Sequence, residues 1–109
     1  MWYIFPQVAG LGRSSMAEAY AIRSRAEAVA FVGHPVLGAR LQRCCEALLK
    51  HQGTTARDIM GSPDDLKLRS SMTLFAMIST QPSVFHKVLD AFYSGVMDER
   101  TVEFLEGNP

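Results

Sequence analysis

The sequence predicts an all-α protein: a single compact domain of five to seven short helices with an irregular, aromatic-rich segment at its N-terminus. Apolar residues recur at helical spacing through most of the chain, and signals that start and stop helices punctuate them. Beyond the opening residues, no stretch shows the sustained apolar–polar alternation that is typical of strands. The length of 109 residues fits one domain, and a hydrophobic content of 48% allows one small core.

The opening stretch, "MWYIFPQVAGLGRSS", is predicted to be irregular because a proline and two glycines interrupt its aromatic run. Two short helices are expected next, over about residues 16–23 and 25–32. Ser15 and Ser24 each begin an S-x-x-E capping box, in which the hydroxyl accepts from an otherwise unpaired amide of the first turn. Gly33 is expected to end the second helix in a left-handed conformation.

The stretch "HPVLGARLQRCCEALLKHQG" predicts the longest amphipathic helix in the first half of the chain. Pro35 suits its first turn and Gly53 ends the pattern, while Leu41 and Leu48 lie on its apolar stripe. A short helical turn is expected over residues 55–60.

The stretch "SPDDLKLRSSMTLFAMIS" predicts a helix over about residues 64–79, with Ser62 as its N-cap and Pro63 at its first position. Its apolar residues fall on two opposite sides, which is typical of a helix buried between neighbours. We therefore expect this helix at the centre of the domain. Two further helices are predicted within "PSVFHKVLDAFYSG" and "DERTVEFLEG", the second capped by Asp98.

Polar side chains on a helix that should be enclosed indicate either a structural network or a functional site. Asp64, Lys67 and Ser71 share one stripe at helical spacing, as the acid, base and hydroxyl of a catalytic site would, and Arg69 lies close by. These three residues are the candidate catalytic group. Alternatively, Asp64 complements the helix dipole and forms an i,i+3 ion pair with Lys67, which requires no function.

The opening stretch carries the candidate ligand-binding residues. Its two glycines permit close backbone approach, Arg13 is a bidentate donor for an anion, and Ser14 lies at a helix N-terminus where free amides favour phosphate. Trp2 and Phe5 offer rings that can stack on a base. The stretch lacks the G-K-[ST] of a P-loop. The alternative is that the aromatic residues belong to the core and the polar residues only cap a helix.

Cys44 and Cys45 are adjacent in a helical context, where geometry disfavours a disulfide between them. We interpret them as packing residues in a reducing compartment, because no C-x-x-C spacing is present. His34 is predicted to cap a helix, and no histidine or cysteine has metal-ligand spacing. We expect no metal and no cofactor.

The formal net charge is zero, from 11 basic and 11 acidic side chains, which argues against nucleic-acid binding because such binding needs a strong positive field. No stretch approaches the roughly 20 apolar residues of a membrane span. The opening stretch also lacks the basic region of a signal peptide. We expect a cytoplasmic protein with neither nucleic-acid nor membrane partners.

Four stretches occur in a familiar order: "MWYIFPQVAGLGRSSMAEAYAI", "HPVLGARL", "GSPDDLKLRSSMTLFAMI" and "DERT". They resemble the bacterial and fungal domain-of-unknown-function family DUF 1810 over nearly the whole chain. The resemblance implies a small, mostly helical, cytosolic protein without a named activity. A weaker similarity, of helical pattern alone, links the chain to the NADAR family of NAD and ADP-ribose metabolism. No catalytic residue of that family is matched here.

Members of DUF 1810 usually carry a helical segment upstream of the opening stretch. Met1 stands where that segment would join it, so the resemblance implies a shortened member that lacks the family's N-terminal helix. We expect apolar surface to be exposed as a consequence, and a homo-oligomer to cover it.

Two hypotheses about function follow, and whether the protein is an enzyme stays open. The first is a protein that binds or processes a phosphorylated or nucleotide-like molecule such as ADP-ribose. Its pocket would bring the opening stretch onto the central helix, with Trp2, Phe5, Gln7, Arg13, Ser14 and Tyr20 facing Asp64, Lys67, Arg69 and Ser71. The alternative is a non-catalytic protein-interaction module, which would have a flat apolar patch instead of a cavity.

Overall fold

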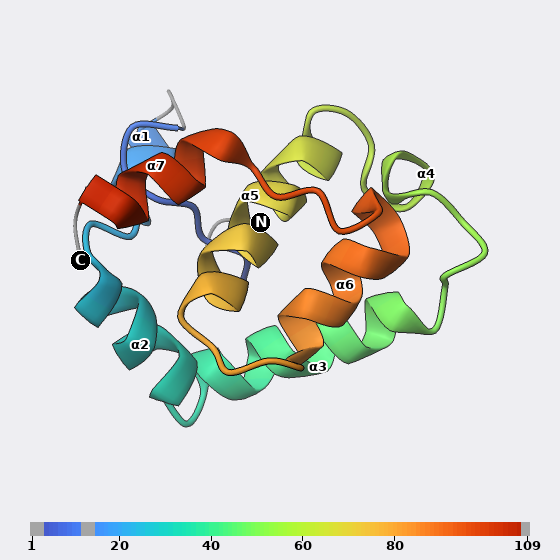
Figure 1. The fold of residues 1–109 in the computed structure, drawn as a ribbon, viewed down its shortest axis with the longest axis horizontal. Helices are drawn as coiled ribbons and strands as arrows, with labels where there is room; N and C mark the ends of the chain where they lie inside the picture. The colour runs from blue at the N-terminus through green and yellow to red at the C-terminus, as the bar shows by residue number, and fades with distance from the viewer. Residues whose placement is uncertain (1–3, 12–14, 108–109) are drawn as a thin grey trace.

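The computed structural model describes residues 4–11 and 15–107, and these residues form seven helices and no strand (Figure 1). The helices are α1 (Ser15–Ala19), α2 (Arg25–Gly33), α3 (Leu37–Leu49), α4 (Ala56–Met60), α5 (Asp64–Met77), α6 (Val84–Tyr93) and α7 (Glu99–Gly107). The predicted all-α fold is therefore confirmed, and the predicted helices occur in the expected order.

Helix α5 runs through the middle of the molecule (Figure 1), and residues 70–76 are all buried. These consecutive residues span nearly two turns, so no face of this part of the helix meets solvent. α2, α4, α6 and α7 pack against α5, and α3 packs against α2 and α6. The expectation of a central helix is confirmed, although α5 ends at Met77 and not at Ser79.

The apolar core centres on Phe75 of α5. Its ring centroid lies 5.6 Å from that of Phe31 in α2 and 5.5 Å from that of Phe85 in α6, separations at which aromatic rings attract one another. Leu41 and Cys45 add fully buried side chains from α3. Four helices thus share one core.

The opening segment belongs to the interior as well. The Ala9 amide donates to the Ile22 carbonyl and the Ile22 amide donates to the Gln7 carbonyl, each at 2.8 Å, which forms an isolated parallel bridge at Val8. Phe5 and Val8 are buried in the core. The bridge holds the segment beside the chain between α1 and α2 and so fixes where its side chains lie.

Two predicted caps are confirmed. Ser24 Oγ accepts from the Glu27 amide at 3.1 Å, although the Glu27 carboxylate accepts from the Arg23 amide and not from that of Ser24. His34 Nδ1 accepts from two backbone amides at the start of α3, at 3.1 and 3.0 Å. Both side chains satisfy amides that the following helix leaves unpaired.

Two more predicted helix ends are wrong, besides that of α5 and that of α1, which ends at Ala19 and not near residue 23. Gly33 does not have a left-handed φ and is the last residue of α2, and the extended conformation of His34 ends that helix. α3 stops at Leu49, well before Gly53, because its last turn tightens into hydrogen bonds between residues three apart.

Two predicted N-caps also differ. Ser15 is the first residue of α1 and therefore lies inside the helix, and Pro63 takes the N-cap position of α5 that was expected for Ser62. A capping box that sequence reasoning missed begins α6: the His86 amide donates to Ser83 Oγ, and the Ser83 amide donates to His86 Nδ1, both at 3.3 Å. The histidine ring takes the role that Glu or Gln usually has.

Gly38 marks a close approach of α3 to the end of α2, because a β-carbon there would overlap the backbone carbonyl of Val32. We expect Gly38→Ala to lower the free energy of unfolding by about 2–3 kcal/mol, since a packed backbone must move. Gly33→Ala is the matched control, with open space around the residue and a helix preference worth up to about 1 kcal/mol. Urea denaturation measures both changes, and equal effects would contradict this packing explanation.

Candidate functional site

A hollow of about 290 Å³ lies where the opening segment, the first half of α5 and the start of α7 meet. We call it the α5–α7 hollow. Its polar and charged lining comes from three parts of the chain: Gln7 from the opening segment, Lys67, Arg69 and Ser70 from α5, and Asp98 and Arg100 from the start of α7. Leu11, Pro63 and Leu66 supply its apolar walls.

The charge of the lining is predominantly positive. Lys67, Arg69 and Arg100 carry cations, and Asp98 is the acidic residue among the described lining residues. One oxygen of the Asp98 carboxylate is already engaged, because Oδ2 accepts from the Thr101 amide at 3.0 Å and from the Thr101 hydroxyl at 2.6 Å. These bonds cap α7 and fix the carboxylate in place, so the described lining has three cationic groups and one acidic group.

Two polar atoms at the hollow have no hydrogen-bond partner among the described residues. Gln7 is only 8% exposed, and its Oε1 is enclosed and unpaired. Arg69 Nε is likewise enclosed and unpaired. Buried polar groups are nearly always bonded, so each such atom calls for a partner beyond the described residues, such as a water molecule, an ion or a ligand. The two residues that carry these enclosed atoms both line the α5–α7 hollow.

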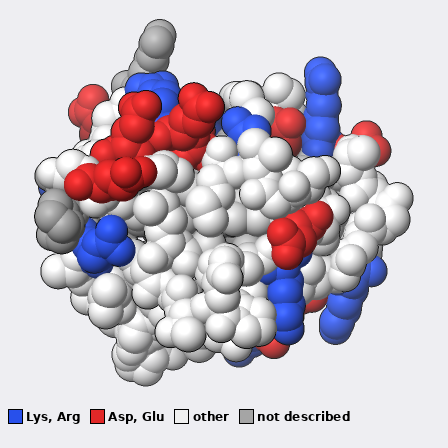
Figure 2. All heavy atoms as spheres, in the orientation of Figure 1, with Lys and Arg blue, Asp and Glu red and all other residues white. Residues whose placement is uncertain are grey.

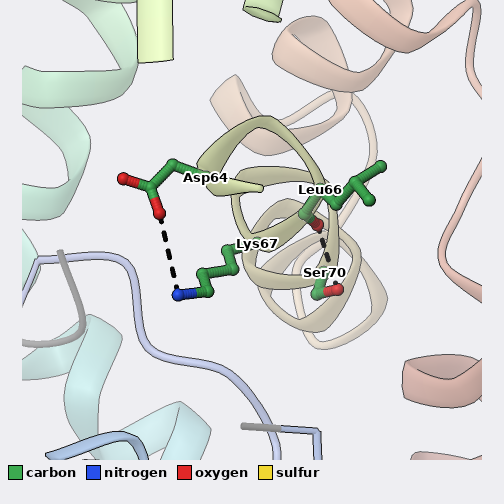
Figure 3. Close-up of polar contacts among 4 residues, drawn as sticks. All are labelled: Asp64, Leu66, Lys67 and Ser70. Atoms are coloured by element: carbon green, nitrogen blue, oxygen red, sulfur yellow. Dashed lines mark hydrogen bonds and ion pairs between the residues drawn. The ribbon is translucent and has the colours of Figure 1, made fainter. Parts of the chain in front are cut away.

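Figure 3 shows that side chains in the first turns of α5 extend from different sides of the helix. Asp64 and Lys67 extend from one side and form an ion pair, with 3.7 Å between Nζ and Oδ1. Ser70 lies on another side and donates its hydroxyl to the Leu66 carbonyl at 3.2 Å. The i,i+3 pair that was weighed as the structural alternative is therefore present.

The candidate catalytic residues are not brought together around one hollow. Lys67 lines the α5–α7 hollow, but Asp64 and Ser71 are not among its described lining residues. Ser71 is fully buried, and its Oγ has no partner among residues 4–11 and 15–107. The reason is positional, since Ser71 is one turn further along α5, where every face of the helix is covered.

The candidate ligand-binding residues are also divided. Gln7 and Arg69 line the hollow, whereas Phe5 belongs to the core and Tyr20, 45% exposed, follows α1 at the surface. Trp2, Arg13 and Ser14 lie outside the described residues. The hollow is thus lined by residues from both predicted stretches.

Sequence reasoning missed the contribution of α7. Asp98 was predicted only as a cap, and Arg100 was assigned no role. Both reach the hollow because Thr73 joins α5 to the start of α7: its Oγ1 accepts from the Asp98 amide at 2.9 Å and donates to the Arg69 carbonyl at 2.8 Å. No local pattern indicates a bond between residues 25 positions apart.

Thr73→Val tests this connection. We expect the variant to lose about 1–3 kcal/mol of unfolding free energy, because the Asp98 amide would keep its place without an acceptor. Thr73→Ser, which keeps the hydroxyl, should retain more of the stability. Chemical denaturation of the wild type and the two variants measures their free energies of unfolding. A valine variant as stable as the serine variant would contradict a stabilising role for the Thr73 hydroxyl.

The two cysteines differ in environment, and both are free thiols. Burial in the core raises the pKa of Cys45 to about 12, with smaller contributions from Cys44 and Glu46. Its Sγ lies 3.6 Å from Met72 Sδ, inside the core. Cys45 is therefore a packing residue, as predicted, and its thiolate is suppressed at neutral pH.

Thiol labelling at pH 8 should consequently modify Cys44, which is half-buried, and spare Cys45 until the protein unfolds.

The free energy of unfolding should also fall as the pH rises from 9 towards 12, because the unfolded Cys45 thiol ionises near 9.0 while the folded thiol stays neutral. Mass spectrometry of the labelled peptide and denaturation at several pH values measure the two effects. Equal labelling rates would show that Cys45 is accessible.

Within residues 4–11 and 15–107, no group of three or more His, Cys, Asp or Glu side chains is placed to hold a metal ion. Across the same residues, no helix combines the length and the apolar character that a bilayer crossing requires.

The fold and the hollow define a small all-α domain whose polar hollow is built on its central helix. The chain belongs to the family described as "Protein of unknown function (DUF1810)", whose sequence profile matches residues 1–105. It is similar to a solved structure, the conserved hypothetical protein Rv1873 from Mycobacterium tuberculosis, with 45% sequence identity and a TM-score of 0.92. That match covers 96% of this chain and 75% of the Rv1873 chain. No curated protein matched the chain.

Proposed function

We propose that the protein binds a small phosphorylated or nucleotide-like molecule, with the phosphate in the α5–α7 hollow. The observation that carries the proposal is the convergence of Lys67, Arg69 and Arg100 on a hollow that also contains the enclosed, unpaired amide oxygen of Gln7. Arginine and lysine donors suit phosphate. Lys67 and Arg69 are half-buried, so their charges are screened less than that of the exposed Arg100.

The size of the hollow limits what it can enclose. At about 290 Å³, it is at the lower end of the volumes found for small-molecule sites, so it suits a phosphate group and the atoms next to it. A dinucleotide would have to extend beyond it. The weak similarity to NADAR proteins makes ADP-ribose one useful probe, and the proposal does not depend on that similarity.

The proposal concerns binding and leaves catalysis aside. Lys67 is already paired with Asp64, and Ser71 is enclosed on a fully covered turn. A catalytic role for these residues stays a prediction. We also propose a cytoplasmic location, in which the free thiols of Cys44 and Cys45 stay reduced.

The interaction-module hypothesis finds less support. Among the described residues, the large apolar side chains with the greatest exposure come from different places along the chain: Tyr20, Val29, Val36, Ile59, Leu66 and Val96. No two of them share a helix, so none of the described helices presents a row of such side chains to solvent. A homo-oligomer likewise stays a prediction.

Binding of pyrophosphate, AMP, NAD and ADP-ribose, measured by thermal shift and calorimetry, tests the proposal. We expect at least one of these compounds to raise Tm, and Lys67→Ala or Arg100→Ala to weaken its binding by a factor of about ten or more, because each removes a charge-assisted contact worth roughly 1.5–3 kcal/mol.

Arg43→Ala is the matched control, since Arg43 is an exposed cation of α3 that does not line the hollow. Arg13→Ala tests the predicted donor that lies outside the described residues. Failure of all four compounds to bind would reject the proposal, as would equal weakening by Arg43→Ala.

A further inference from the structure

A second hollow, of about 310 Å³, adjoins the first. It is lined by residues 8–11 of the opening segment and by Arg100, Glu103 and Phe104 of α7. Leu11 and Arg100 line both hollows. Arg100 Nη2 donates to the Gly10 carbonyl at 3.4 Å, so the guanidinium group lies between α7 and the opening segment at the boundary of the two hollows.

The two hollows differ in chemistry. Among the described lining residues, the α5–α7 hollow has three cations, whereas the second hollow has one cation, Arg100, and the carboxylate of Glu103. Glu103 is exposed and makes no ion pair within the described residues. A carboxylate accepts hydrogen bonds and donates none, so it favours a hydroxyl or amine donor and disfavours a second phosphate. Leu11 and Phe104, both half-buried, add apolar surface for a carbon skeleton.

The surroundings strengthen this difference. Acidic side chains gather over α7 in Figure 2, and the helix carries Glu99, Glu103 and Glu106. Negative charge along this helix opposes an extended polyanion that would leave the cationic hollow in that direction. A ligand that crosses Arg100 must therefore be neutral or hydrogen-bond-donating at its far end.

From these observations we infer that the ligand is a phosphate ester with a compact, hydroxyl-bearing group, which passes over Arg100 and donates hydrogen bonds to Glu103 in the second hollow. The inference rests on the proposed function for the position of the phosphate. It adds the chemical nature of the remainder of the ligand and assigns Glu103 as the residue that selects it.

Three probes test the contributions of the phosphate and of the hydroxyl-bearing group separately. They are inorganic phosphate, n-butyl phosphate, which has a carbon chain without hydroxyls, and ribose 5-phosphate. Calorimetry should show ribose 5-phosphate binding at least tenfold more tightly than either of the others. Glu103→Gln should weaken ribose 5-phosphate about fivefold to tenfold, and it should leave inorganic phosphate unchanged or tighter because a negative charge is removed.

Glu106→Gln is the matched control, because it removes the same charge from the same helix at an exposed position outside both hollows. Unchanged Tm values would show that both variants fold. Equal affinities for n-butyl phosphate and ribose 5-phosphate, or equal effects of the two glutamine variants, would overturn the inference and leave the proposed function standing. If none of these three probes bound, the inference would be rejected, and the proposed function would be rejected with it if pyrophosphate, AMP, NAD and ADP-ribose also failed to bind.

Discussion

The enclosure of α5 is the constraint on which the rest of the structure depends. Residues 70–76 are buried on all sides, and Ser70, Ser71 and Thr73 are among them. Polar atoms in such a place are costly unless they find partners. The Ser70 and Thr73 hydroxyls each donate a hydrogen bond to the backbone carbonyl one turn earlier in α5. The Thr73 hydroxyl also accepts a hydrogen bond from the Asp98 amide. One buried hydroxyl thereby sets the distance between the central helix and the start of α7.

The site follows from how burial changes along α5. Leu66 is 53% exposed, whereas every residue from Ser70 to Ala76 is buried, so the helix passes from the surface into the core within its first two turns. Lys67 and Arg69 lie on this transition, where a cation can keep contact with water while its stem is packed. The opening segment closes one side of the transition because its bridge to Ile22 fixes Gln7 there. The hollow is thus a product of how the opening segment, α5 and the start of α7 pack together.

The sequence allowed the helices and their order to be predicted, because capping signals and apolar spacing are local. It also allowed Lys67, Arg69 and Gln7 to be chosen, since polar residues on a two-sided apolar helix, and beside an aromatic run, are unusual. Periodicity alone could not separate Lys67 from Ser71: both lie on one stripe, and burial changes along the helix as well as around it. Arg100 escaped notice because its position depends on a tertiary hydrogen bond between α5 and α7.

The unpaired atoms at the hollow connect stability with binding. Gln7 Oε1 and Arg69 Nε are enclosed but have no hydrogen bond among the described residues, unlike Thr73 and the Asp98 amide, which bond to each other. Each unpaired group lowers the free energy of unfolding of the free protein by roughly 1–3 kcal/mol. Both residues line the α5–α7 hollow beside Lys67 and Arg100, so a shift of either enclosed side chain would let the ligand of the proposed function recover part of that cost. Ser71 Oγ has the same deficit in a fully covered turn, where no ligand can reach it. The position of an unpaired group, more than its existence, therefore distinguishes a binding site from a tolerated imperfection of the core.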